Sequence, residues 1–129
     1  MKSSRILTAI IVEDEAAPRR LLRRLLERHH AGTVEVIAEA EEGPAGLVLC
    51  EARRPDVIFL DLNLPGFGGL ELLSRLRSPS HVIITTADLR RAVKAQREKG
   101  FDYLLKPVDP EQLGAAVARV AASIATRAT

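Results

Sequence analysis

The sequence of 129 residues has little cysteine and few aromatic side chains. Its one cysteine, Cys50, excludes an internal disulfide and leaves no second thiol for a cysteine-based metal site. Aromatic residues make up 3% of the chain, so the core must be aliphatic. No apolar run approaches the length of a membrane span, and the first one ends in Glu13-Asp14-Glu15, unlike a signal peptide. We therefore expect a cytoplasmic protein with no membrane contact.

Charge gives a weak indication of partners. The formal net charge is +2, with acids and bases nearly balanced. The one local excess of positive charge is RRLLRRLLER at residues 19–28, whose leucines form the apolar stripe of an amphipathic helix. We interpret its arginines as a solvated face, open to an acidic partner. Nucleic-acid binding is less favoured, because no aromatic stacking residues or recognition-helix pattern accompany the charge.

Apolar runs alternate with helical patterns along the chain. Runs typical of buried parallel strands occur at residues 6–12, 34–38, 57–60, 82–84 and 103–105. Helical patterns occupy residues 15–29, 44–53, 68–77, 89–99 and 110–126. The alternation predicts an α/β fold with a doubly wound five-stranded parallel sheet and five helices.

Two of the helices carry further signals. Asp109 is placed to cap the last helix, Pro110 suits its first position, and Gln112 stands where a capping-box partner would. The polar stretch at residues 95–99 narrows the apolar face of the helix at 89–99. We therefore expect that helix to be short or mobile.

Polar side chains collect at the ends of the predicted strands. Carboxyl ends of parallel strands share one edge of the sheet, where ligands bind in such folds. A single acid there is commonly a cap or a surface charge, but acids on two strands and a lysine on a third argue for a site. We expect this set to converge on the edge, with Asp61 anchored by its apolar run and exposed there. The set comprises Glu13, Asp14, Asp61, Thr85, Thr86 and Lys106.

The composition of this set favours a magnesium site. Glu13, Asp14 and Asp61 would repel one another, and without a counter-charge at least one would have a raised pKa. Carboxylates without sulfur or clustered histidine suit a hard ion such as Mg²⁺. His29, His30 and His81 have no acid or cysteine spaced to join them, and we do not expect them to bind metal. The pattern indicates a carboxylate nucleophile prepared for phosphoryl transfer.

Four motifs occur in an order that resembles a known family. They are IVEDE at 11–15, FLDLNLPG at 59–66, ITTA at 84–87 and YLLKP at 103–107. Together they resemble a response-regulator receiver domain of two-component signalling, over residues 5–124. The resemblance implies the flavodoxin-like receiver fold with strand order 2-1-3-4-5, in a single domain over residues 1–129. The wording FDYLLKPV is similar to receivers that precede LytTR-type DNA-binding domains, and we expect no output domain within this chain.

The resemblance implies a role for each acid of the site. Asp61 would be the phosphoacceptor and a ligand of Mg²⁺. Asp14 would bind the ion directly, and Glu13 directly or through water. The backbone carbonyl of Asn63 would complete the set of protein ligands.

It also implies roles around the phosphoryl group. Lys106 would pair with the group, and the Lys106–Pro107 bond is expected to be cis. Thr86 would be the switch hydroxyl because it directly precedes the small Ala87, whose backbone would contact the phosphoryl group; Thr85 is the alternative.

Three further positions concern switching and lifetime. Tyr103 matches the aromatic switch position, with a partly buried core tyrosine as the alternative. Asn63 and Asp88 follow Asp61 and Thr86 by two residues, where receivers tune the lifetime of the acyl phosphate. Polar groups there predict comparatively fast phosphate loss.

These observations favour a phosphorylation-controlled switch and not an enzyme in the usual sense. A sensor histidine kinase would phosphorylate Asp61. The chain would promote this transfer and would also promote hydrolysis of the acyl phosphate, at a slow rate. The face formed by residues 89–99, 103–105 and 110–126 would then change, regulate transcription and form a homodimer, with DNA bound only through an output domain. The alternative is a protein-binding module that works without phosphorylation. A flavin-binding protein is disfavoured, because no Ser/Thr/Gly-rich loop follows the first strand.

Overall fold

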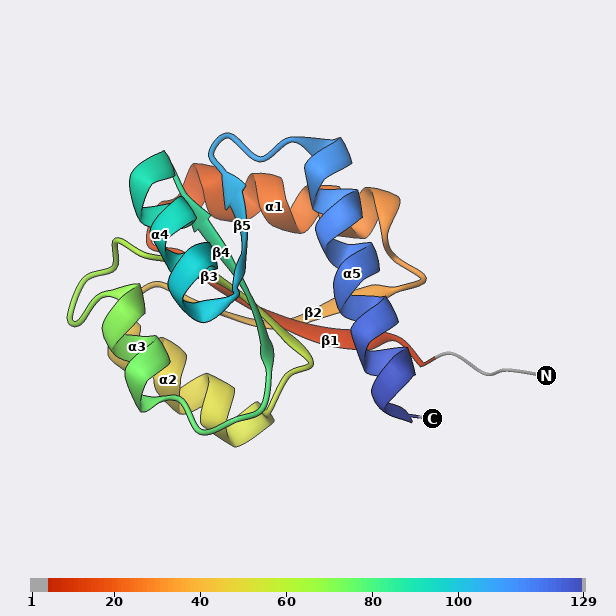
Figure 1. The fold of residues 1–129 in the computed structure, drawn as a ribbon, viewed down its shortest axis with the longest axis horizontal. Helices are drawn as coiled ribbons and strands as arrows, with labels where there is room; N and C mark the ends of the chain where they lie inside the picture. The colour runs from red at the N-terminus through yellow and green to blue at the C-terminus, as the bar shows by residue number, and fades with distance from the viewer. Residues whose placement is uncertain (1–4, 129) are drawn as a thin grey trace.

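Strands and helices alternate throughout the part of the chain that the computed structural model describes, residues 5–128 (Figure 1). The strands are β1 Leu7–Val12, β2 Val34–Ala40, β3 Val57–Asp61, β4 His81–Thr86 and β5 Asp102–Leu105. The helices are α1 Ala16–His29, α2 Gly43–Arg53, α3 Gly69–Arg75, α4 Leu89–Lys99 and α5 Pro110–Ala128. The predicted order of elements is confirmed.

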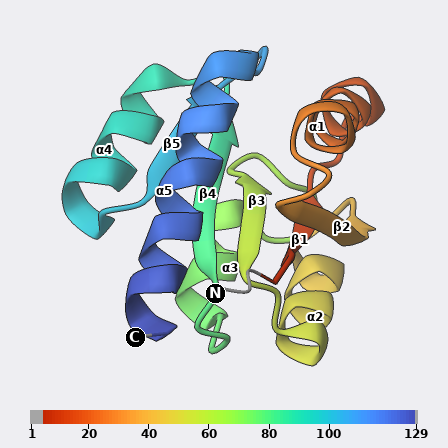
Figure 2. The same ribbon diagram turned by 90° about the vertical axis from the view of Figure 1, so that its right-hand side faces the viewer.

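The strands form one parallel sheet in the order β2-β1-β3-β4-β5, as expected, with β2 and β5 at its edges (Figure 2). The central strands are apolar on both faces because helices cover both sides. One core packs α1 and α5 against the sheet, through residues such as Leu26, Phe59 and Leu113. The second core packs α2, α3 and α4 against the other face. The carboxyl ends of β1, β3 and β4 are thereby held rigidly side by side.

Helix α4 corrects one expectation, because it runs its full eleven residues from Leu89 to Lys99. Asp88 caps its start by accepting from the backbone N–H of Arg91, and Gly100 ends it with a positive φ of 76°. Ala92 and Ala95 form its buried face. Small side chains therefore suffice to seat this polar helix on the sheet. The prediction that it would be short was wrong, and the alternative that it is mobile stays a prediction.

Helix α3 is shorter than its pattern predicts, because it begins at Gly69 and ends at Arg75. A Cβ on Gly69 would lie 2.4 Å from the carbonyl oxygen of Asp61. Only glycine allows this close approach of the helix to the end of β3.

The predicted cap of α5 is confirmed, because Asp109 accepts from the backbone N–H of Gln112.

The arginines of α1 correct a second expectation. Arg19 pairs with Glu39 of β2 at 3.0 Å, and Arg23 pairs with both Glu39 and Glu27. Arg19 also donates to the backbone carbonyl of Glu13 at 2.9 Å. This part of the basic face is engaged within the chain because α1 packs beside β2, and it is not a fully solvated surface.

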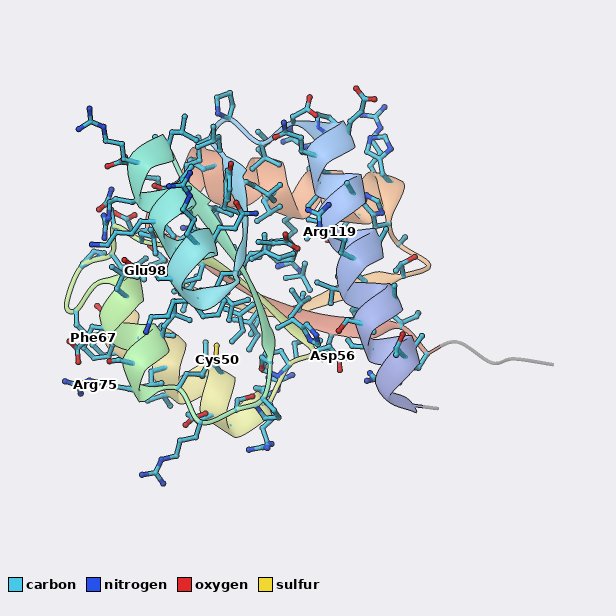
Figure 3. The ribbon with its side chains drawn as sticks, viewed as in Figure 1. Cys50, Asp56, Phe67, Arg75, Glu98 and Arg119 are labelled. Atoms are coloured by element: carbon cyan, nitrogen blue, oxygen red, sulfur yellow. The ribbon has the colours of Figure 1, made fainter. Side chains whose placement is uncertain are left out.

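Cys50, labelled in Figure 3, is a buried thiol of α2, as expected. Burial, followed by the nearby charge of Glu51, raises the pKa of this thiol to about 12. The side chain therefore packs as a small apolar group. Within residues 5–128, no helix is long and apolar enough to cross a bilayer.

Candidate functional site

Asp61 is the last residue of β3 and lies opposite Thr85 of β4 in the sheet register. Its side chain is buried, with 3% of the residue exposed. The expectation that the sheet edge exposes this aspartate was therefore wrong: the neighbouring strand ends and the close approach of α3 enclose it. Its Oδ1 accepts from the backbone N–H of Asn63 at 3.1 Å.

Lys106 joins two of the predicted acids. Its Nζ lies 2.5 Å from Glu13 Oε1 and 3.1 Å from Asp61 Oδ2. Burial lowers the pKa of Lys106, but the bonds to the two carboxylates outweigh this and leave the pKa raised. The ammonium is therefore charged and held between the ends of β1 and β3. The peptide bond from Lys106 to Pro107 is cis, as expected.

Glu13 is the most perturbed acid of the site. It is 3% exposed, and burial raises its pKa to about 7, although the bonds from Lys106 and from the backbone N–H of Glu15 act in the opposite direction. The neighbouring Asp61 raises the pKa further. Two buried carboxylates thus share one ammonium, so acidic groups outnumber cationic groups in the site.

The acids after β1 fit a hard cation. Carboxylate oxygens of Glu13, Asp14 and Glu15 all lie within 4.8 Å of one another. An all-oxygen set with a buried member of raised pKa suits Mg²⁺. Glu15 was not among the predicted ligands, although its place in the acidic run at 13–15 was a signal for it. Asp61 is not part of this close group, so its role and that of the Asn63 carbonyl as metal ligands stay predictions.

The two threonines of β4 differ in their surroundings. Thr86 is fully buried, and its Oγ1 accepts from the backbone N–H of Asp88 at 3.1 Å. Thr85 lines a cavity of about 430 Å³ together with Glu13 and Lys106. Ala87, which follows Thr86, is exposed. The choice between the two hydroxyls as the switch stays a prediction.

Tyr103 is half-buried, and it lies beside Ile84 of β4 in the sheet register. Its ring packs against the core between the sheet and helices α2, α3 and α4. It is thus a partly buried tyrosine at an edge strand, which is compatible with either interpretation of this position.

Asn63 and Asp88 both bond to Arg91, a residue that the sequence did not single out. Arg91 Nη1 donates to Asn63 Oδ1 at 2.6 Å, and the backbone N–H of Arg91 donates to Asp88 Oδ1 at 3.3 Å. The loop after β3 is thereby tied to the first turn of α4. No local sequence pattern indicates a bond between residues so far apart.

The comparisons with known proteins agree with this arrangement. The model of the response regulator receiver domain matches residues 9–118. The chain belongs to this family. As a receiver domain it is a phosphoacceptor module of two-component signalling and not an enzyme of the usual kind, and the predicted resemblance is confirmed.

Relatives in bacteria support the same assignment. An uncharacterized response regulatory protein of Vibrio parahaemolyticus is 39% identical over 117 residues, covering 89% of this chain and 48% of the relative. The transcriptional regulatory protein BtsR of Escherichia coli is 36% identical over 118 residues, with 89% and 48% coverage. The chain thus spans about half the length of these curated relatives.

A solved structure is similar over nearly the whole chain. The receiver domain of AraT, a response regulator from Geobacillus stearothermophilus, has a TM-score of 0.84 and 35% sequence identity. The similarity covers 97% of this chain and 100% of that one. The receiver fold of this domain is therefore confirmed.

Proposed function

We propose that Asp61 accepts a phosphoryl group from a cognate sensor histidine kinase and that the receiver thereby switches an output. The observation that carries this proposal is the shared lysine: Asp61 and Glu13 bind the same ammonium at 3.1 and 2.5 Å. The nucleophile, a fixed cation and the acidic group are thus within one polar cluster. Phosphoryl transfer requires the nucleophile to lie close to the groups that neutralise charge on the phosphoryl oxygens, namely the lysine and a metal ion held by the acidic group.

The chemistry assigns a task to each residue. An oxygen of Asp61 forms a bond to phosphorus while the bond from phosphorus to the donor breaks, and the donor keeps that electron pair. Lys106 then pairs with a phosphoryl oxygen, as a point charge does at other phosphate sites. Glu13, Asp14 and the backbone carbonyl of Asn63 would hold Mg²⁺, with Asp61 as a further ligand. When bound, the ion supplies the positive charge that two buried carboxylates and one lysine lack.

Switching follows from the new charge on Asp61. The Oγ1 of Thr86 leaves the backbone N–H of Asp88 and donates to the phosphoryl group, which the backbone of Ala87 also contacts. Tyr103 then moves inward, and the face formed by α4, β5 and α5 shifts between two states. This face mediates a homodimer in the proposal. The output is transcription through a LytTR-type DNA-binding domain outside this chain, in line with a relative that is a transcriptional regulator.

Incubation with acetyl phosphate and Mg²⁺ tests the acceptor. We expect intact-mass measurement to detect one added phosphoryl group on the wild-type chain, and none after Asp61→Asn or with excess EDTA. Asp102→Asn is the matched control, since it removes the same charge from β5, where Asp102 pairs with Arg119 of α5; Arg119 is labelled in Figure 3. Labelling that persists in Asp61→Asn would disprove the proposal, as would loss of labelling in the control.

A further inference from the structure

Arg91 of α4 forms a polar bridge to the loop that directly follows Asp61. Its Nη1 donates to Asn63 Oδ1 at 2.6 Å, and Asn63 in turn donates its backbone N–H to Asp61. Asn63 is exposed, whereas Asp61 is buried. The bridge therefore lies on the exposed part of the loop that directly follows the buried nucleophile.

The backbone of Arg91 is held in the first turn of α4. The backbone N–H of Arg91 donates to Asp88 Oδ1, and the backbone N–H of Asp88 donates to Thr86 Oγ1. These bonds connect the end of β4 to the loop after β3 through a single arginine. The cap thus fixes the backbone of Arg91, and the bond to Asn63 holds its guanidinium group.

The bond from Arg91 takes up one of the two lone pairs of the Asn63 carboxamide oxygen. A free carboxamide oxygen can accept a hydrogen bond from water and orient that water. An oxygen that already accepts from a guanidinium binds water less strongly, because the charged donor is the stronger partner. Hydrolysis of an acyl phosphate at Asp61 needs an oriented water. The water oxygen forms a bond to phosphorus, the bond from phosphorus to the aspartate oxygen breaks with its electron pair on the carboxylate, and a proton of the water passes to solvent.

We infer that Arg91 is a positioning residue that lengthens the lifetime of the phosphorylated state by keeping the Asn63 carboxamide from orienting the attacking water. The inference rests on the proposed function, since it concerns the loss of a phosphoryl group from Asp61. It adds a residue of α4, on the face proposed to switch, to the control of the reaction centre.

The test follows phosphate loss from the purified phosphorylated chain by intact mass, after labelling with acetyl phosphate and Mg²⁺ and removal of the donor. We expect Arg91→Ala to shorten the lifetime about three- to tenfold, the range for loss of one hydrogen bond. Arg91→Lys keeps a cationic donor and should restore part of the lifetime. Arg90→Ala removes the same charge one residue earlier, where no bond of the side chain is seen within residues 5–128, and should leave the lifetime unchanged.

A double-substitution cycle separates the route through Asn63 from a direct contact of Arg91 with the phosphoryl group. In an Asn63→Ala background, Arg91→Ala should have no further effect. An equal shortening in both backgrounds, or a wild-type lifetime in Arg91→Ala, overturns the inference. These outcomes differ from failure of the proposed function, in which the wild-type chain would not be labelled at all.

Discussion

Two clusters of charged residues, one around Asp56 and one around Lys106, lie at opposite ends of the sheet and differ in their balance of charge. At the amino ends of the strands, Asp56 accepts from two nitrogens of Arg5 at 2.7 and 2.8 Å, and from the backbone N–H of Thr8 at 2.8 Å. Hydrogen bonding to Arg5 lowers the pKa of Asp56. At the carboxyl ends, Glu13 and Asp61 share Lys106, and the pKa of Glu13 is raised to about 7.

The difference separates a structural cluster from a functional one. One carboxylate with several donors is satisfied and stabilises the fold, whereas two carboxylates with one ammonium retain mutual repulsion. That repulsion is relieved by whatever brings positive charge or removes negative charge. The end of the sheet that binds ligands in this fold is therefore the end that is left unbalanced.

Replacing the satisfied carboxylate should have the largest effect on stability. Asp56→Asn loses the charge that both Arg5 and the Thr8 N–H require, and we expect a loss of about 2 kcal/mol in the free energy of unfolding. Urea unfolding near neutral pH measures it. Asp102→Asn removes one bond to Arg119 from a carboxylate that is more exposed than Asp56, and it should lose less than about 1 kcal/mol. Equal losses in the two variants would show that the number of donors does not matter.

The same comparison explains what the sequence could predict. The apolar runs and their order fix which strand ends share an edge, so Asp14, Asp61 and Lys106 could be grouped without coordinates. Asp88 and Gly100 are readable cap signals for α4, and they outweigh the polarity of residues 95–99. Capping and two buried alanines are enough for this helix.

Contacts between distant side chains could not be predicted. Nothing local in the sequence indicates that Lys106 contacts Glu13 in addition to Asp61, or that Arg91 reaches Asn63. Glu39 likewise looks like a surface charge until α1 is placed beside β2. The pKa of Glu13 depends on such contacts and on burial, so the charge balance of the site emerges only from the folded chain.

The two clusters should respond to pH in opposite directions. Because the pKa of Glu13 is raised, its contribution to stability is complete below its ordinary value of 4.5 and is lost as pH rises through about 7. Because the pKa of Asp56 is lowered, its contribution is present above 3.8 and is lost as pH falls.

Glu13→Gln isolates the first of these effects. In EDTA, the wild-type advantage over Glu13→Gln should fall as pH rises from 4.5 to about 7. Asp56→Asn serves as the control, since its deficit should instead shrink toward acid. If urea unfolding gives Glu13→Gln the same dependence as the wild type over this range, Glu13 does not titrate there and the site is not short of positive charge.

The smallest expected effect concerns how much the charge of Asp61 contributes to the raised pKa of Glu13. Burial is the first cause of the raised pKa of Glu13, and Asp61 is a further one. In metal-free protein, Asp61→Asn should therefore lower this pKa from about 7 without returning it to 4.5, because burial of Glu13 remains. The NMR signal of the Glu13 carboxyl carbon followed against pH measures the change, with Asp102→Asn as a distant control. An unchanged pKa in Asp61→Asn would mean that burial alone sets the titration and that the two acids are independent. A lowered pKa would mean that the charge on Asp61 is felt at Glu13, so that the positive charge of a bound metal or the added negative charge of a phosphoryl group at Asp61 also alters Glu13.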